Sequence, residues 1–88
     1  MTARLLVWTA EGREDYVHWQ TEDRRTLKRI NLLLTDVMRD DPFEGIGKPE
    51  PLKHALAGAW SRRIDETNRL VYTADDHQVI ILQARYHY

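Results

Sequence analysis

The sequence contains no cysteine. This absence excludes a disulfide framework, a zinc site with cysteine ligands and thiol chemistry, and it fits a reducing compartment. A long hydrophobic run is missing too, because the apolar stretch near the N-terminus, Leu5 to Trp8, has only four residues. Such a run is too short for a signal peptide or a membrane span. We therefore expect a cytoplasmic protein with no membrane partner.

A large net charge of either sign is also missing. The 13 basic and 14 acidic side chains leave a net charge of −1. This balance argues against a general nucleic-acid binder, because neutralising phosphates requires clustered lysine and arginine. The distribution is less even, since residues 48–69 carry five basic against three acidic side chains. The sequence therefore permits a local anion site in its C-terminal half.

The first half of the chain indicates one strand and two helices within a single domain, residues 1–88. Residues 4–8 read as a short strand, and residues 10–20 and about 22–38 read as helices, with Thr9 and Thr21 as their N-caps. The second helix is amphipathic, and its apolar stripe consists of Leu27, Ile30, Leu34 and Val37, with Leu33 beside it. That stripe requires a packing partner.

The second half indicates a long loop followed by strands. Residues 42–54 hold all three prolines, and we expect Phe43, Ile46 and Leu52 to pin this loop to the body. Residues 60–65, 69–74 and 78–86 alternate as strands do, with short turns between them that require antiparallel pairing. We predict an α+β fold in which two N-terminal helices pack on one face of a mainly antiparallel twisted sheet. The other face is expected to be free.

The C-terminal half also contains the residue types needed to cleave RNA. A carboxylate can accept a proton, a histidine can donate one near neutral pH, arginines can hold a phosphate, and aromatic rings can stack on bases. The nucleophile would be the ribose 2′-hydroxyl of the substrate, so neither a metal nor another cofactor is expected. The four histidines show no metal-ligand spacing such as HExxH.

Each of these residues also has an ordinary structural interpretation. Isolated histidines such as His54 are usually surface residues, and Glu50 between two prolines could be a plain loop acid. Arg62 and Arg63 could be solvent-facing strand residues, and the three tryptophans are more typical of a core. The residue types alone therefore leave RNA cleavage as one hypothesis among several.

A family resemblance favours that hypothesis. The stretch PFEGIGKPEPLKHALAGAWSRRIDETNRLVY and the ending ARYHY closely resemble the YoeB-type (Txe/YoeB) toxins of the wider RelE-like group. The resemblance implies a microbial-ribonuclease-like fold and cleavage of messenger RNA at A-site codons on the 70S ribosome. It also implies a YefM-type antitoxin as partner, and such toxins often form homodimers.

The resemblance further implies a role for each matching residue. Glu50 would be the general base, Arg69 the phosphate clamp and His87 the general acid, while Tyr88 would orient or stack on the substrate. Phosphate contacts to the message and the ribosome are assigned to Lys48, Lys53, Arg62 and Arg63. Two alternatives stay open: a non-catalytic relative that binds a protein such as gyrase, and a degraded toxin that binds only antitoxin and operator.

Strand register offers an internal test of these roles. Arg69 and His87 must share one face of the sheet if they serve one phosphate, and side chains alternate along a strand. A two-residue turn at Asp75–Asp76 would place them on opposite faces. We therefore predict a three-residue turn, 75–77, or an equivalent bulge.

Overall fold

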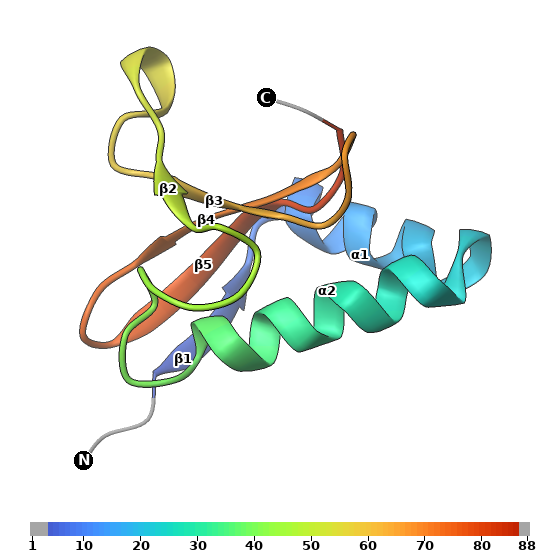
Figure 1. Cartoon of the computed structure of the whole chain (residues 1–88), viewed down its shortest axis with the longest axis horizontal. Helices are drawn as coiled ribbons and strands as arrows, with labels where there is room; N and C mark the ends of the chain where they lie inside the picture. Colours follow the sequence, from blue (N-terminus) through green and yellow to red (C-terminus); the bar gives the residue numbers. More distant parts are fainter. Residues whose placement is uncertain (1–3, 87–88) are drawn as a thin grey trace.

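The computed structural model describes residues 4–86 of the chain. The elements in chain order are β1 (Leu5–Trp8), α1 (Ala10–Glu22), α2 (Arg24–Val37), β2 (Glu50–Pro51), the 3₁₀ turn η1 (His54–Leu56), β3 (Trp60–Arg63), β4 (Arg69–Ala74) and β5 (Gln78–Gln83). The strands form one sheet in the order β1-β5-β4-β3-β2. Its strand pairs are antiparallel except for β1 with β5. Both helices lie on the same side of this sheet (Figure 1), which confirms the predicted α+β fold.

Helix α1 packs unusually close to the sheet. Its N-cap is Thr9, as predicted, whose hydroxyl accepts a hydrogen bond from Gly12 N at 3.0 Å and donates one to Ile81 O at 2.9 Å. A Cβ at Gly12 would collide with the carbonyl oxygen of Ile81. Glycine weakens a helix by about 1 kcal/mol relative to alanine, and here it allows the close approach of α1 to β5.

Helix α2 is capped two residues later than predicted. Its N-cap is Asp23, whose carboxylate accepts hydrogen bonds from Arg25 N at 3.0 Å and Thr26 N at 3.4 Å. Thr21 lies inside α1, and its hydroxyl donates to His18 O at 3.2 Å. The prediction of Thr21 as the cap is therefore wrong. Asp23 satisfies two free backbone N–H groups of the first turn and its charge suits the helix N-terminus.

The main core lies between the helices and the sheet. Its buried residues from β4 and β5 are Leu70, Tyr72, Val79 and Ile81, and those from α2 are Ile30, Leu33, Leu34 and Val37. These α2 residues were predicted, whereas Leu27 of the same stripe is only half-buried. Trp8, Trp19 and Trp60 pack partly buried against this core. The tryptophans therefore serve packing, as their ordinary interpretation predicted.

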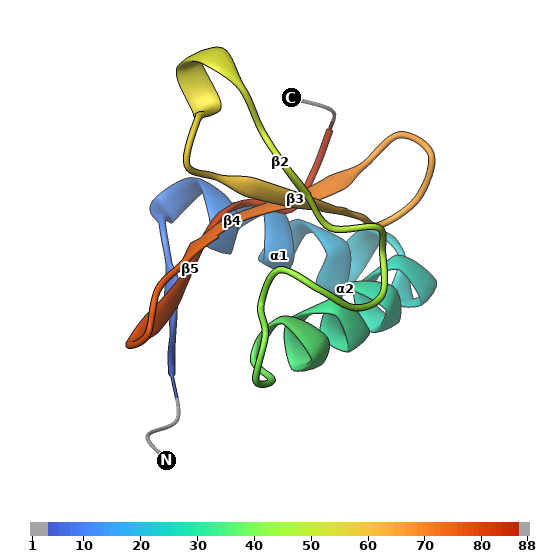
Figure 2. The same cartoon turned by 60° about the vertical axis from the view of Figure 1, so that its left-hand side comes forward.

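The proline-rich connection is ordered, but only part of the predicted pinning is correct. Leu52 is buried, and the Phe43 ring lies 4.7 Å from the Trp60 ring. Ile46 is instead 42% exposed, so its side chain does not pin the loop. The connection also contains β2 and η1, which were not predicted. They form an arm over the face opposite the helices (Figure 2), where Leu52 packs with Ala59 and Val71.

The β4–β5 hairpin contains a bulge. Ala74 pairs with Val79, so the turn is not the predicted three-residue turn. The register then shifts between Val71 and Tyr72, so that Val71 pairs with Gln83. This one-residue shift is the bulge that was predicted as the alternative to the longer turn. Because of it, Val71 lies opposite the odd-numbered Gln83, which is the pairing that a shared face for Arg69 and His87 requires. His87 lies outside the described residues.

Candidate active site

The register of three strands places three predicted site residues on one face of the sheet. Glu50 lies opposite Ser61, Ser61 lies opposite Val71, and Arg63 lies opposite Arg69. Directly opposed residues point to the same face, as do residues two apart on one strand. Glu50, Arg63 and Arg69 therefore share the face that points away from the helices.

A pocket of about 330 Å³ lies beside Glu50 in the arm formed by β2 and η1. Its lining residues are Glu50, Pro51, Leu52, Lys53, His54 and Leu56. Glu50, Lys53 and His54 are exposed there. His54 has a φ of 59°, in the left-handed region that non-glycine residues rarely adopt. The pocket thus offers a carboxylate, a cation and apolar walls to a ligand.

Arg69 is the first residue of β4, and several hydrogen bonds hold it in place. It is only 7% exposed, and its Nη1 donates to Asp65 O at 2.6 Å and to Asn68 O at 3.1 Å. Its backbone N donates to Tyr86 O at 3.0 Å. These contacts engage one nitrogen of the guanidinium, and they fix the direction in which the other two nitrogens point.

The segment before His87 is anchored by residues that the sequence analysis did not assign to the site. Ala84 N donates to the Asp15 carboxylate at 3.0 Å, and Trp19 Nε1 donates to Ala84 O at 2.8 Å. Tyr86 N donates to Asn68 Oδ1 at 2.7 Å. The strand β5 ends at Gln83, earlier than predicted, and the predicted residues His87 and Tyr88 lie outside the described part of the chain.

Arg62 is not the RNA contact that was predicted. Its residue exposure is 0%, and its guanidinium donates to the Asp36 carboxylate, to the Tyr72 hydroxyl and to three backbone oxygens. Those oxygens are Pro42 O at 3.0 Å, Glu44 O at 2.8 Å and Ile46 O at 3.1 Å. A guanidinium with its N–H groups directed at protein acceptors cannot also bind phosphate. We therefore remove Arg62 from the RNA-binding set.

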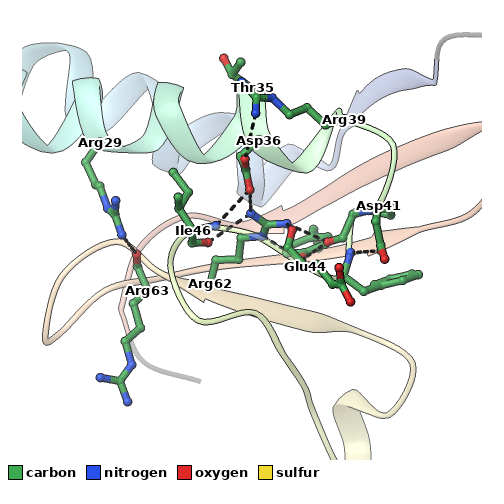
Figure 3. Close-up of polar contacts among 12 residues, drawn as sticks. Arg29, Thr35, Asp36, Arg39, Asp41, Glu44, Ile46, Arg62 and Arg63 are labelled. Atoms are coloured by element: carbon green, nitrogen blue, oxygen red, sulfur yellow. Dashed lines mark hydrogen bonds and ion pairs between the residues drawn. The ribbon is translucent and has the colours of Figure 1, made fainter.

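The neighbouring Arg63 points the opposite way (Figure 3). Its side chain is exposed, whereas its backbone is fixed by Arg63 N donating to Gly47 O at 2.7 Å and Arg29 Nη2 donating to Arg63 O at 3.1 Å. Lys48 and Lys53 are exposed as well. Three of the four predicted phosphate-binding cations are thus accessible to solvent.

Asp36, which pairs with Arg62, and Asp65, in the turn before Arg69, have lowered pKa values. The hydrogen bond from Arg62 is the main cause that lowers the pKa of Asp36 below its ordinary value. Burial acts to raise the pKa of Asp65, but hydrogen bonds from Asn68 and Thr67 outweigh that effect and lower it overall. Both side chains are therefore ionised at neutral pH. Burial raises the pKa of Tyr72, which keeps that hydroxyl neutral.

Residues 4–86 contain neither a metal-binding cluster nor a membrane-spanning helix. No group of three or more histidine, aspartate or glutamate side chains there is placed to hold a metal ion. The α-helices have 13 and 14 residues, fewer than the roughly 20 that a bilayer requires, so neither can cross a membrane.

Comparison with known proteins agrees on the class of this chain. Residues 8–88 match the family model of the YoeB-like toxin of bacterial type II toxin–antitoxin systems. Toxin YoeB of Streptomyces coelicolor is 60% identical over 83 residues, which cover 94% of this chain and 98% of that protein.

Two solved structures from Staphylococcus aureus share the fold along nearly the whole chain. A YoeB dimer is 42% identical with a TM-score of 0.90, covering 99% of this chain and 100% of that chain. A YoeB–YefM complex is 45% identical with a TM-score of 0.87, covering 98% and 100%. The protein is thus a toxin of a type II toxin–antitoxin system. Within that class, the chain belongs to the YoeB-like family.

Proposed function

We propose that this toxin is a ribosome-dependent endoribonuclease that cleaves messenger RNA at A-site codons and so inhibits translation. The observation that carries the proposal is the convergence of Glu50, Arg63 and Arg69 on the sheet face opposite the helices. A protein that acted only by binding a partner would not need a carboxylate on the same face as a restrained arginine. The YoeB-like family is consistent with this chemistry.

The proposed reaction is an intramolecular transesterification. The Glu50 carboxylate accepts the proton of the ribose 2′-hydroxyl, and the 2′-oxygen attacks the adjacent phosphorus. The bond from phosphorus to the 5′-oxygen breaks, and His87 donates a proton to that leaving oxygen. The products are a 2′,3′-cyclic phosphate and a 5′-hydroxyl. No metal or other cofactor takes part in this scheme.

Arg69 is assigned to the phosphate. Its Nη1 is occupied by Asp65 O and Asn68 O, and we assign the N–H groups on Nε and Nη2 to the non-bridging oxygens. An arginine held in place before the substrate arrives stabilises developing charge without reorganisation. Tyr88 is proposed to orient or stack on the substrate.

The exposed cations are proposed to dock the ribosome and the message. Lys48 and Lys53 flank Glu50 in the connection, and Arg63 lies opposite Arg69. Because the net charge is −1, docking to two polyanions depends on this local group.

The protein partner is proposed to be an antitoxin of the YefM type. The relative from Staphylococcus aureus forms a YoeB–YefM complex and also a dimer. At 42–45% identity over nearly the full length, this chain is proposed to bind such an antitoxin and to form homodimers. The cytoplasm, where ribosomes translate messages, is the proposed location.

The test is cleavage of a defined messenger by purified protein, with and without 70S ribosomes. We expect cleavage only with ribosomes, and we expect a single 2′-deoxy nucleotide at the scissile position to abolish it. Glu50→Gln and His87→Ala should each lower the rate constant by about 10²–10⁴-fold. Glu14→Gln, a change at an exposed glutamate of α1, is the matched control and should retain full activity.

Two results would contradict the proposal. Cleavage of the 2′-deoxy messenger at the normal rate would exclude attack by the 2′-hydroxyl. Folded protein that cleaves no RNA under any of these conditions would favour the alternative, a toxin that acts by binding a protein such as gyrase.

A further inference from the structure

The turn between β3 and β4, residues 65–68, is held by an aspartate at its first position. Asp65 Oδ1 accepts hydrogen bonds from Thr67 N at 2.8 Å and Asn68 N at 2.6 Å. Asn68 O in turn accepts from Ile64 N at 3.0 Å. An aspartate that accepts from backbone N–H groups two and three residues ahead is a common way to stabilise a turn. These bonds alone account for the turn.

The Asn68 side chain makes a further connection that the turn does not require. It is 9% exposed, and its Nδ2 donates to Asp65 Oδ2 at 3.1 Å while its Oδ1 accepts from Tyr86 N at 2.7 Å. The opposite orientation of the amide would place its NH₂ against the Tyr86 N–H and its oxygen against the carboxylate. Only one orientation is therefore compatible with both neighbours.

The Tyr86 peptide is held from both sides. Its N–H is bound by Asn68, and its carbonyl accepts from Arg69 N at 3.0 Å. Tyr86 has a φ of 66°, a left-handed conformation that is unfavourable for a residue with a Cβ. Such a conformation persists only where the surroundings impose it. The hydrogen bonds to residues 68 and 69 are contacts that impose it here.

The same turn also holds the Arg69 side chain. Arg69 Nη1 donates to Asp65 O and Asn68 O, so the turn contacts both the guanidinium and the backbone of Tyr86. His87 follows Tyr86 directly in the sequence. One short turn therefore links the residue proposed to bind the phosphate with the segment that leads to the proposed general acid.

We propose that Asn68 is a positioning residue for RNA cleavage, because its side chain fixes the backbone at Tyr86 relative to Arg69. This inference rests on the proposed function. Without the Asn68 oxygen, the Tyr86 N–H loses its acceptor and the residue can relax to a negative φ. The backbone of Tyr86, to which His87 is joined, would then no longer be fixed relative to Arg69. A misplacement of about 1 Å in an active site can cost about 100-fold in rate.

The experiment compares three variants with the parent on ribosome-bound messenger. Asn68→Ala removes both side-chain contacts. Asn68→Asp keeps an oxygen for Tyr86 N but places a second carboxylate against Asp65. The double variant Asp65→Asn/Asn68→Asp exchanges the amide and the carboxylate, which restores one donor between them. Thr67→Ala is the matched control, because the bond from this residue to Asp65 comes from the backbone.

We expect Asn68→Ala to lower kcat by about 10- to 100-fold, with KM and ribosome affinity changed by less than about twofold. The double variant should recover most of kcat, whereas Asn68→Asp alone should not. Hydrogen exchange of the Tyr86 amide gives a readout independent of activity. It should be fast in Asn68→Ala and slow again in the double variant.

Each remaining outcome overturns the inference in a recognisable way. An active parent with an equally active Asn68→Ala shows that the side chain does not position the site. A loss of activity that merely follows the loss of folded protein, with no change in kcat per folded molecule, shows a structural role only. If parent and variants are all folded and equally inactive, the proposed function itself has failed, and the inference fails with it.

Discussion

Asp36 on α2 and Arg62 on β3 form an ion pair between the helix layer and the sheet, although 26 residues separate them. The same guanidinium donates to the backbone oxygens of residues 42, 44 and 46. These hydrogen bonds hold the first half of the connection from α2 to β2 against β3. Asp36 also accepts from Ile46 N at 3.1 Å. Gly45 lies so close to the Asp36 carboxylate that no Cβ fits. The ion pair therefore shapes the loop that leads to Glu50.

This arrangement predicts opposite consequences for two adjacent arginines. Arg62→Ala removes the ion-pair partner of Asp36 and one donor from each of three backbone oxygens. Breaking a buried pair typically costs about 3–5 kcal/mol of unfolding free energy. Arg62→Lys should lose less, because the charge remains. Arg63→Ala changes an exposed side chain and should stay within about 0.5 kcal/mol of the parent. Urea unfolding measures all three, and equal losses at both positions would contradict the assignment.

The lowered pKa of Asp36 predicts how stability depends on pH. A carboxylate whose pKa is lower in the folded state than its ordinary value of 3.8 contributes stability above that value. The contribution is lost as the pH falls through the folded pKa. Asp65, Asp23 and Asp75 also have lowered pKa values and act in the same direction.

We therefore expect the unfolding free energy to decline below a pH of about 4. In Asp36→Asn this decline should be shallower, and the variant should be less stable than the parent at neutral pH. Urea titrations from pH 2 to pH 7 measure both effects. Parallel curves for parent and variant would show that Asp36 does not contribute to the decline.

Helix propensity predicts that Gly12→Ala stabilises the protein, whereas the structure predicts that it destabilises it. Replacing glycine by alanine inside a helix normally stabilises it, by about 1 kcal/mol. Here the new Cβ would collide with the Ile81 carbonyl, so we expect Gly12→Ala to destabilise the protein by about 1–3 kcal/mol. Gln20→Ala, on the exposed side of the same helix, is the control. Thermal unfolding of both variants measures the effect. A raised melting temperature for Gly12→Ala would refute the close contact.

The exposed cations predict a change in salt dependence rather than in chemistry. Lys53→Ala and Arg63→Ala should weaken ribosome binding, and each should reduce the slope of log affinity against log salt by about 0.7–0.9. Cleavage at saturating ribosome concentration should be little affected. Binding measured across a series of potassium chloride concentrations provides the test. An unchanged slope in both variants would remove these residues from the docking surface.

The helices and most strand positions were predictable because their signals are local. The stripe from Leu27 to Val37 has the helical period, and residues 69–74 alternate within bounds that match β4. The parallel pairing of β1 with β5 was not predictable, because nothing in residues 5–8 specifies a partner about seventy positions away. Ordinary hydrophobic patterning identifies a strand but not its neighbour.

The sequence provides candidate residues for the site, but it does not show which way each of their side chains points. Arg62 and Arg63 look alike in sequence, and strand alternation sends one to the core side and the other to the open face. The core accommodates Arg62 because Asp36 on α2 and three backbone oxygens of the following connection accept from it, and all these partners are distant in the sequence. The role of Asn68 was missed for a similar reason, since its acceptor contact is with Tyr86, 18 positions later.

The pairing of β1 with β5 also affects the order of folding. Strand β4 pairs with β3 and with β5, its neighbours in the sequence. The pairing of Leu5 with Gln78 instead closes a loop of more than seventy residues. Each doubling of loop length costs about 0.6 kcal/mol of closure entropy. We therefore expect the β3–β4–β5 hairpins to form before β1 docks. Substitutions at Leu6 should accelerate unfolding and leave the refolding rate nearly unchanged, as stopped-flow kinetics can measure.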